Sequence, residues 1–270
     1  MTLDAAGPPA GAPAPPTSSA TQLRRPPTLA GARVLVVGGS SGIGRAAAEL
    51  LALDGAEVVL TAREDVRAAR VASEIARGTS DRGGSVRSAA VDVTDPDSVQ
   101  ALVAGLGALD HVLVTAAVLA VGPVVGPETA TELNGESRVL GGHRVVRACL
   151  PRMRSGGSIT LTSGIYATRP VPGSALAAAS LGAVEAMTRA LALELAPLRV
   201  NCLRPGSTDT PLLRRFVDAD ADGSLTTAGR HVPLGRVGTA EEVAAGALFL
   251  MTNTYVTGTV LTVDGGAGLA

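Results

Sequence analysis

The sequence contains no lysine, and all 23 basic residues among its 270 are arginine. A Schiff-base lysine, a lysine general base and the lysine of a phosphate-binding P-loop are therefore excluded. Aromatic residues are almost as scarce, because the chain has no tryptophan, two phenylalanines and two tyrosines. A tyrosine that donates a proton can only be Tyr166 or Tyr255.

The sequence also lacks an excess of either charge and any long apolar run. Its formal net charge is −1, so no overall field favours nucleic acid or an anionic membrane. No apolar run approaches the ~18 residues that a membrane-spanning helix needs. The two cysteines, Cys149 and Cys202, do not have the spacing of a metal site. We therefore expect a cytoplasmic protein that binds a small molecule, with no metal, nucleic-acid or membrane partner.

The composition changes near residue 28. Residues 1–28 are rich in proline and alanine, lack hydrophobic periodicity and predict a disordered tail. The remaining residues, 29–270, show no internal repeat and no second boundary. They predict a single domain.

Short apolar segments alternate with helical patterns through this domain. Strands are expected at residues 33–37, 57–61, 86–91, 110–114, 158–162, 199–203 and 259–263. The longer helices are expected at 46–53, 64–77, 136–154, 176–195 and 240–251, and Thr94-Asp95-Pro96-Asp97 predicts the start of another helix. Strict alternation of this kind favours an α/β fold of Rossmann type, a doubly wound parallel sheet in one domain.

The first predicted strand leads directly into Gly38-Gly39-Ser40-Ser41-Gly42-Ile43-Gly44, where a helix is expected to begin. Glycines at this point allow backbone N–H groups and the helix N-terminus to approach a pyrophosphate closely. A glycine cluster alone is weak evidence. Its position between the first strand and the first helix is typical of a dinucleotide-binding site.

The segment Val37-Gly38-x-x-x-Gly42-Ile43-Gly44 resembles the glycine motif of the short-chain dehydrogenase/reductases, and the resemblance extends over about residues 30–266. It implies that Asp92 and Val93 flank the adenine, and that the segment after Pro205 holds the nicotinamide and phosphates. It also implies a homodimer or homotetramer, because Val263-Asp264-Gly265-Gly266 matches a segment that lies near a subunit interface. The implied cofactor-binding residues are Gly38, Ser40, Ser41, Gly42, Ile43, Gly44, Asp92, Val93, Pro205, Gly206, Thr208 and Thr210.

Residues after the second strand bear on the choice of cofactor. An acidic residue there would bind the ribose 2′-hydroxyl and repel a 2′-phosphate. The sequence instead has Ala62 followed by Arg63, and Arg45 lies in the first helix. Two guanidinium groups without a carboxylate favour NADP(H) over NAD(H). The alternative is that both arginines are ordinary surface residues.

The family's four catalytic positions all differ in this sequence. By resemblance, Ala177 and Leu181 occupy the positions of the catalytic tyrosine and lysine. Gly164 occupies the usual serine position, and Arg138 occupies the asparagine position. An alanine and a leucine can neither donate a proton nor bind a ribose hydroxyl. The ordinary proton path of the family is therefore excluded.

Three residues are candidates to replace the missing groups. Tyr166 could donate a proton from the loop after the fifth strand, Arg138 could stabilise a developing alkoxide, and Ser163 could polarise a carbonyl. With one of them, the protein would be an oxidoreductase acting on a carbonyl, imine or enone. Two alternatives stay open: a cofactor-binding partner or regulatory subunit without redox turnover, and a non-redox isomerase or dehydratase.

Overall fold

A seven-stranded parallel sheet forms the centre of the computed structural model, which describes residues 28–125, 134–217 and 224–270. The predicted tail, apart from Thr28, lies outside the described residues. The strand order is β3-β2-β1-β4-β5-β6-β7. The strands are β1 (Arg33–Val37), β2 (Glu57–Ala62), β3 (Ser85–Ala90), β4 (Leu109–Val114), β5 (Met153–Thr162), β6 (Arg199–Pro205) and β7 (Val260–Val263).

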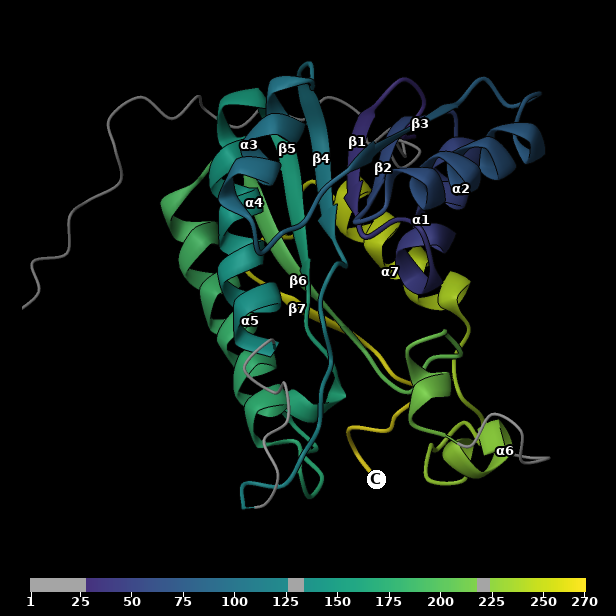
Figure 1. Ribbon diagram of the computed structural model, residues 1–270, viewed down its shortest axis with the longest axis vertical. Coiled ribbons are helices and arrows are strands. Elements are labelled where there is room, and N and C mark those ends of the chain that lie inside the picture. Colours follow the sequence, from purple (N-terminus) through teal and green to yellow (C-terminus); the bar gives the residue numbers. More distant parts are fainter. Residues whose placement is uncertain (1–27, 126–133, 218–223) are drawn as a thin grey trace, which may run out of the picture.

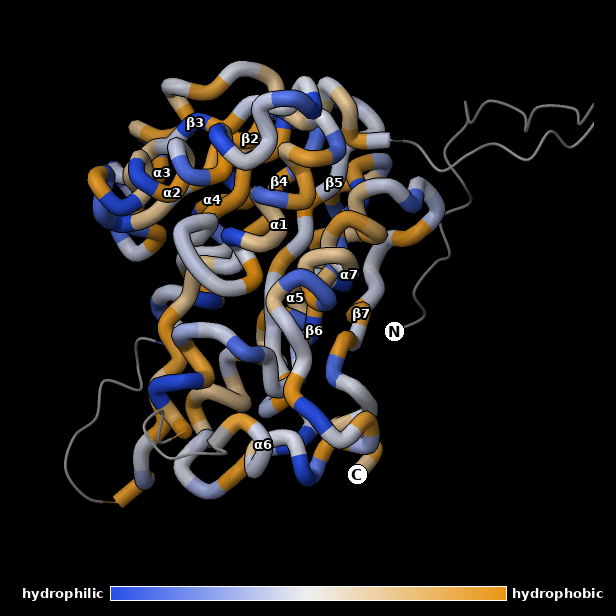
Figure 2. The backbone as a smooth tube through the Cα atoms, turned by 90° about the vertical axis from the view of Figure 1, so that its right-hand side faces the viewer, coloured by the Kyte–Doolittle hydropathy of each residue, from blue (hydrophilic) through white to orange (hydrophobic). Residues whose placement is uncertain are grey.

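Helices cover both faces of this sheet, and the predicted doubly wound fold is confirmed (Figure 1). One layer contains α3 (Pro96–Ala104), α4 (Gly141–Cys149) and α5 (Ala175–Glu194). The other contains α1 (Gly42–Leu53), α2 (Asp65–Gly78) and α7 (Ala240–Thr252). The short helix α6 (Ser224–Gly229) and the C-terminus lie together at the lower end of the molecule in Figures 1 and 2.

The hydrophobic core is divided into two halves by the sheet. Along β1, Leu35 and Val37 pack into one half, while Val34 and Val36 pack into the other. All four side chains are fully buried, which explains why this strand is apolar throughout instead of alternating. Hydrophobic segments, drawn in orange, accordingly lie at the centre of the molecule around β2 and β4 (Figure 2).

The strand order creates a crevice next to β1. The chain runs from β1 outward to β2 and β3, then returns to place β4 on the other side of β1. The loops that leave β1 and β4 therefore diverge at the carboxyl end of the sheet. In open α/β sheets, ligands bind at this point of reversal.

The region before β5 differs from the prediction. The helix expected at 136–154 consists of a π-helical turn, η2 (Gly135–Leu140), followed by α4, which ends at Cys149. A 3₁₀ turn, η3 (Leu150–Arg152), contains Pro151, which cannot supply the N–H that a continuing helix needs. Strand β5 begins directly afterwards and is ten residues long, so it starts earlier than predicted.

Among the described residues, α5 is long and apolar enough to cross a membrane by length and composition. It packs against β6 and η2. Almost half of its apolar window is buried in the molecule, 44%. The apolar character of α5 is therefore that of a helix layered on a sheet.

Candidate functional site

A cavity of about 540 Å³ opens at the carboxyl end of the sheet. Its walls come from the segments that follow β1, β2, β3, β4, β5 and β6. All predicted site residues except Arg45 line it: Gly38, Ser40, Ser41, Gly42, Ile43, Gly44, Arg63, Asp92, Val93, Arg138, Ser163, Tyr166, Pro205, Gly206, Thr208 and Thr210. The fold thus brings together residues that are up to 172 positions apart, from Gly38 to Thr210.

The glycine segment forms a tight turn, here called the glycine cradle, in which larger residues would clash with the neighbouring chain. A Cβ atom at Gly44 would clash with the carbonyl oxygen of Gly38 and with Oγ1 of Thr115 at 2.5 Å. A Cβ atom at Gly38 would lie 2.6 Å from the backbone nitrogen of Ala116, and the φ of Gly38 is +93°. A turn this tight, with no side chains on the glycines that line the cavity, suits the close approach of a pyrophosphate. The residues present therefore fit a dinucleotide cofactor.

The N-terminus of α1 points its positive end at this cradle. Ser41 is the N-cap residue, and its side chain makes no capping hydrogen bond. The Thr115 hydroxyl holds the turn by donating to the carbonyl oxygens of Val37 and Gly38, at 3.1 and 3.2 Å. The first-turn N–H groups of a helix attract anions, and phosphate groups commonly bind at such a position. The role of Thr115 is a finding of the structure, because its partners are almost 80 positions away in sequence.

Asp92 is held rigidly where β3 ends. Its Oδ1 atom accepts hydrogen bonds from the hydroxyl and the backbone N–H of Thr94, at 2.7 and 2.9 Å. These bonds, with a smaller contribution from the charge of Arg63, lower the pKa of Asp92. Val93 lies beside it in the cavity wall. The side chain of Asp92 is therefore an oriented hydrogen-bond acceptor at the end predicted to bind adenine.

The arginines after β2 differ from the prediction in one respect. Arg63 lines the cavity, and so does Arg67, one turn further along the chain. Arg45 is paired with Glu49 at 3.0 Å and with Glu74 at 3.1 Å, and it does not line the cavity. Arg67, and not Arg45, is therefore the second arginine of this region that lines the cavity. The spacing of four residues from Arg63 was the signal in the sequence.

The segment after β6 is a hydrogen-bonded loop that closes the opposite side of the cradle. The Thr208 hydroxyl donates to the carbonyl oxygen of Gly206 at 3.0 Å, and the Thr210 hydroxyl donates to that of Thr208 at 3.2 Å. The methyl group of Thr210 lies 3.1 Å from a Cβ atom placed on Gly42. The loop and the glycine cradle are therefore in direct contact at Thr210 and Gly42.

Ser163 has a buried acceptor for its proton. Its hydroxyl donates to Oε1 of Glu185 at 2.8 Å, and both residues are buried. Arg204 binds the same carboxylate through two nitrogens, at 2.8 and 2.6 Å. Burial raises the pKa of Glu185, but the bonds from Arg204 and Ser163 outweigh it, so the pKa is lowered. In this arrangement the Ser163 hydroxyl proton is bound to Glu185 and is not available to a substrate carbonyl. The predicted polarisation of a carbonyl by Ser163 would therefore require this hydrogen bond to break.

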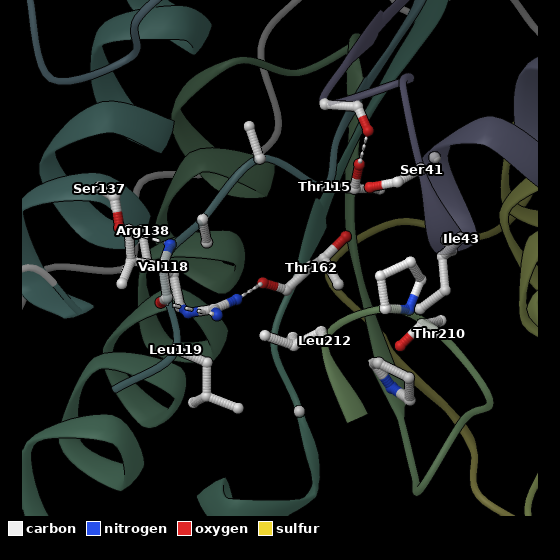
Figure 3. A pocket seen from close by; sticks show the side chains of 18 of the residues that line it. Ser41, Ile43, Thr115, Val118, Leu119, Ser137, Arg138, Thr162, Thr210 and Leu212 are labelled. Carbon is white, nitrogen blue, oxygen red and sulfur yellow. Dashed lines mark hydrogen bonds between the residues drawn. The ribbon is translucent and has the colours of Figure 1, made fainter. Parts of the chain in front are cut away.

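Arg138 and Tyr166 both line the cavity. Figure 3 shows Arg138 across the cavity from Ser41 and Ile43, with Thr162 between them. The Arg138 guanidinium donates to the carbonyl oxygens of Thr162 and Val118, at 3.1 and 3.4 Å. Burial lowers the pKa of Arg138 to about 10, so the group keeps its charge at neutral pH.

The corner of the cavity near α5 is apolar. Leu181 lines it and is 2% exposed, while Ala177 is buried one turn earlier on the same helix. A Cβ atom at Gly164 would lie 3.4 Å from Cδ2 of Leu181. The three positions that the sequence comparison assigned to tyrosine, lysine and serine are thus filled by groups that cannot transfer a proton.

Comparison with known proteins agrees with this geometry. The family model described as enoyl-(acyl carrier protein) reductase matches residues 37–268. The short-chain dehydrogenase/reductase ATR9 of Stachybotrys chlorohalonatus is 35% identical over 260 residues, which cover 90% of this chain and 99% of the relative.

Two solved structures are also similar. The MalC reductase/Diels-Alderase of Malbranchea aurantiaca has a TM-score of 0.81 and 31% identity, covering 90% of this chain and 98% of that one. A small-chain dehydrogenase in complex with NADPH has a TM-score of 0.73 and 33% identity, covering 89% of this chain and 100% of that one. With the cradle, the parallel sheet and these similarities, the chain belongs to the short-chain dehydrogenase/reductase family, whose members use NAD(P)(H).

Proposed function

We propose that the protein is an NADP(H)-dependent oxidoreductase that acts on a small carbonyl, imine or enone through a proton path that differs from the family's usual one. The observation that carries this proposal is the continuous cavity of about 540 Å³. It extends from the glycine cradle to an apolar part, the substrate chamber, whose lining includes Val118, Leu119, Leu181 and Leu212. The reduced nicotinamide, when bound, supplies a hydride. The chain must bind the cofactor, orient the substrate and manage the charge that forms.

Binding of the phosphates is assigned to the cradle and the N-terminus of α1. The N–H groups of the turn and the helix supply fixed donors, and Thr115 keeps the turn in place. Asp92 and Val93 receive the adenine, and Thr208 and Thr210 hold the nicotinamide end. These assignments combine the lining residues with the resemblance of the motifs.

A preference for NADP(H) is supported by the charges after β2. Arg63 and Arg67 both line the cavity, and Ala62 stands where an acid would bind the ribose 2′-hydroxyl. Guanidinium groups recognise phosphate by charge-assisted hydrogen bonds. Two carboxylates, of Glu64 and Asp92, also line this end, so the preference is argued from the forked guanidinium donors of Arg63 and Arg67 and not from a net positive charge.

The test is calorimetric titration with NADPH and NADH, which suits a chain without tryptophan. Arg63→Gln and Arg67→Gln should each weaken NADPH binding about tenfold, the equivalent of about 1.4 kcal/mol, and leave NADH binding unchanged. Arg70→Gln is the matched control, because Arg70 lies on the same helix, is exposed and pairs with Glu74 outside the cavity. Tighter binding of NADH would refute the preference, and no binding of either cofactor would refute the proposed function.

A second candidate is a non-redox reaction in the same cavity, with the cofactor bound but not consumed. Two observations favour it: Ala177 and Leu181 supply no proton-transfer group, and one similar protein is named a reductase/Diels-Alderase. NADPH binding combined with no NADPH oxidation on carbonyl, imine, enone or quinone substrates would support this candidate over the first. Oxidation of NADPH by any of these substrates would support the first.

A further inference from the structure

Within the part of the chain that the structure describes, Arg138 is a buried cation without an anionic partner. Its side chain is 9% exposed, and none of the ion pairs among the described residues includes it. Two backbone carbonyls, of Thr162 and Val118, accept hydrogen bonds from its terminal nitrogens, and the buried Nε has no partner. A guanidinium has five N–H donors, so most of them are unused. Burying a charge in this way is unfavourable unless something else neutralises it.

The local backbone explains why this side chain reaches the cavity. Arg138 lies in the π-helical turn η2, which precedes α4 and packs against α5. A π turn inserts one residue into a helix and changes the direction of the side chains around it, and such turns are frequent at functional sites. The guanidinium is fixed between the end of β5 and the segment after β4 (Figure 3). It is therefore a preorganised donor group.

The surroundings of Arg138 are apolar. The same part of the cavity is lined mostly by hydrophobic side chains: Val118, Leu119, Ile165, Leu181, Leu212 and Phe216. The acids that line the cavity among residues 28–125, 134–217 and 224–270 are Glu64 and Asp92, which follow β2 and β3 at the adenine end. Among the described residues, the substrate chamber thus offers one buried positive charge, Arg138, in mostly hydrophobic walls, and a second, exposed one, Arg215, between Leu212 and Phe216. A ligand that fits it is apolar and places an oxygen that carries negative charge against Arg138.

We propose that Arg138 holds the oxygen of an apolar conjugated carbonyl substrate, an enone or a quinone, and stabilises the negative charge that forms on it. This inference rests on the proposed function and names its substrate class. It makes Arg138 a catalytic residue, because the guanidinium would touch the reacting oxygen. Preorganised donors aimed at developing charge are among the strongest contributions to catalysis.

Reduction of an enone does not need the proton that the family's tyrosine would supply. An enone accepts a hydride at its β-carbon from NADPH, which leaves as NADP⁺, and the electrons of the C=C bond move so that the carbonyl oxygen becomes an enolate. The enolate oxygen lies against Arg138, and water then delivers a proton to the α-carbon to give the saturated ketone. A simple ketone would instead form a much more basic alkoxide, which needs an acid next to it. An iminium substrate would place a second cation beside Arg138, which is unfavourable at short range.

The first experiment measures charge stabilisation without turnover. The NADP⁺-loaded protein is titrated with 4-nitrophenol over a range of pH, and the coloured phenolate reports the pKa of the bound phenol. We expect this pKa to be lowered by about one unit or more, which is about a tenfold preference for the anion. Arg138→Gln should abolish the shift, and Arg138→Lys, which keeps the charge, should restore part of it. Arg147→Gln, an exposed arginine on α4, should change nothing.

A phenol that binds in its neutral form, or a shift that persists in Arg138→Gln, would overturn the inference. Because Arg138 also joins two segments by hydrogen bonds, each variant is first checked by its thermal midpoint. Should Arg138→Gln fail to fold, the Arg138→Lys variant still distinguishes charge stabilisation from a structural role, since it retains the positive charge and loses the planar guanidinium. Loss of the whole shift in a folded Lys variant would assign Arg138 to structure and overturn the inference.

The second experiment compares substrate classes by NADPH oxidation. Cyclohexenone and menadione should be turned over with kcat/KM at least about tenfold above that of N-methyl-3,4-dihydroisoquinolinium or cyclohexanone. Arg138→Gln should lower kcat for the enone more than it changes KM, because the charge forms only in the reaction. Faster reduction of the iminium would overturn this inference and leave the proposed function intact. Failure to bind NADPH would remove the proposed function, whereas normal NADPH binding with an unshifted nitrophenol pKa would overturn only the assignment of Arg138.

Discussion

His111 shows how burial sets the charge of a single residue. It lies in β4 and is 9% exposed, and its Nδ1 shares a hydrogen bond of 2.8 Å with the Ser158 hydroxyl. Burial, together with the nearby charge of Arg199, lowers the pKa of His111 from 6.5 to about 4. The imidazole is therefore neutral in the folded protein throughout the physiological range. In the unfolded chain it takes up a proton below about pH 6.5.

This difference predicts a loss of stability in acid. The contribution of His111 is complete above pH 6.5 and falls as the pH is lowered towards 4, because the unfolded state then binds the additional proton. The loss should approach about 3 kcal/mol near pH 4. Urea unfolding of the wild type and of His111→Gln between pH 7.5 and 4.5 measures it. The wild type should lose stability more steeply than the variant, and the exposed His143→Gln should behave like the wild type. Equal slopes for all three proteins would contradict the prediction.

At the same scale, the sequence identified which residues line the site but not what they bind. The motifs placed Gly38, Asp92 and Thr210 correctly in the cavity wall. They could not show that the Ser163 hydroxyl donates a hydrogen bond to Glu185. They also could not show that Arg45 forms ion pairs with Glu49 and Glu74. Glu185 and Glu74 are 22 and 29 positions from their partners, and only packing of α5 on β5 and of α2 beside α1 brings them together. A side chain's partner depends on such tertiary contacts, which a local pattern does not contain.

At the scale of elements, helix α7 depends on a side chain from a strand. Arg199 in β6 donates to the carbonyl oxygens of Leu250 and Met251, at 2.6 and 2.7 Å, in the last turn of α7. The last carbonyls of a helix have no partner within it, and a cation is favourable at that end. Helix α7 packs beside α1, whose N-terminus forms the cofactor cradle. The bond from Arg199 therefore supports the layer that carries the cradle.

We predict that Arg199→Met destabilises the protein by about 2–3 kcal/mol, because buried carbonyl oxygens lose their donor. Chemical denaturation measures the change. Arg152→Met is the control: Arg152 is exposed, and the same substitution there should change stability by less than about 0.5 kcal/mol. A loss at Arg199 no greater than that at Arg152 would show that other groups satisfy the end of α7.

The elements themselves were predictable where periodicity was strong. Six of the seven strands and the long helices α1, α2, α5 and α7 were expected within four residues of their observed bounds, whereas β5 begins five residues before its expected start. The region before β5 was not, because the π turn η2 and the 3₁₀ turn η3 both keep the sequence pattern of a helix. Arg138 lies in this region, in the π turn η2. The sequence pattern alone could not reveal this local departure from regular geometry, which contains the residue that we propose to be catalytic.

At the scale of the whole molecule, the sheet formed by the described residues has two edge strands, β3 and β7, and exposed aromatic side chains lie near the β7 edge. Strand β7 is last in the strand order, and its residues are only partly buried. Apolar side chains are exposed on the elements that lead to it: Phe249 on α7 is 46% exposed, and Tyr255 in the loop before β7 is 98% exposed. An open edge strand with exposed aromatic residues beside it is unfavourable in an isolated molecule. The segment Val263-Asp264-Gly265-Gly266, which the sequence placed near a subunit interface, begins at this edge.

We therefore expect a homodimer or homotetramer in which a second copy covers the β7 edge. Light scattering coupled to size-exclusion chromatography should give at least twice the mass of one chain, which is 26.8 kDa. Phe249→Asp and Tyr255→Asp, which place a charge on the surface to be buried, should shift the population towards smaller species at low protein concentration. Val66→Asp is the control, because Val66 is 84% exposed on α2, and α2 packs against β3 at the other end of the sheet. A monomeric wild type would contradict the expectation, and an unchanged mass for both aspartate variants would move the interface to another face.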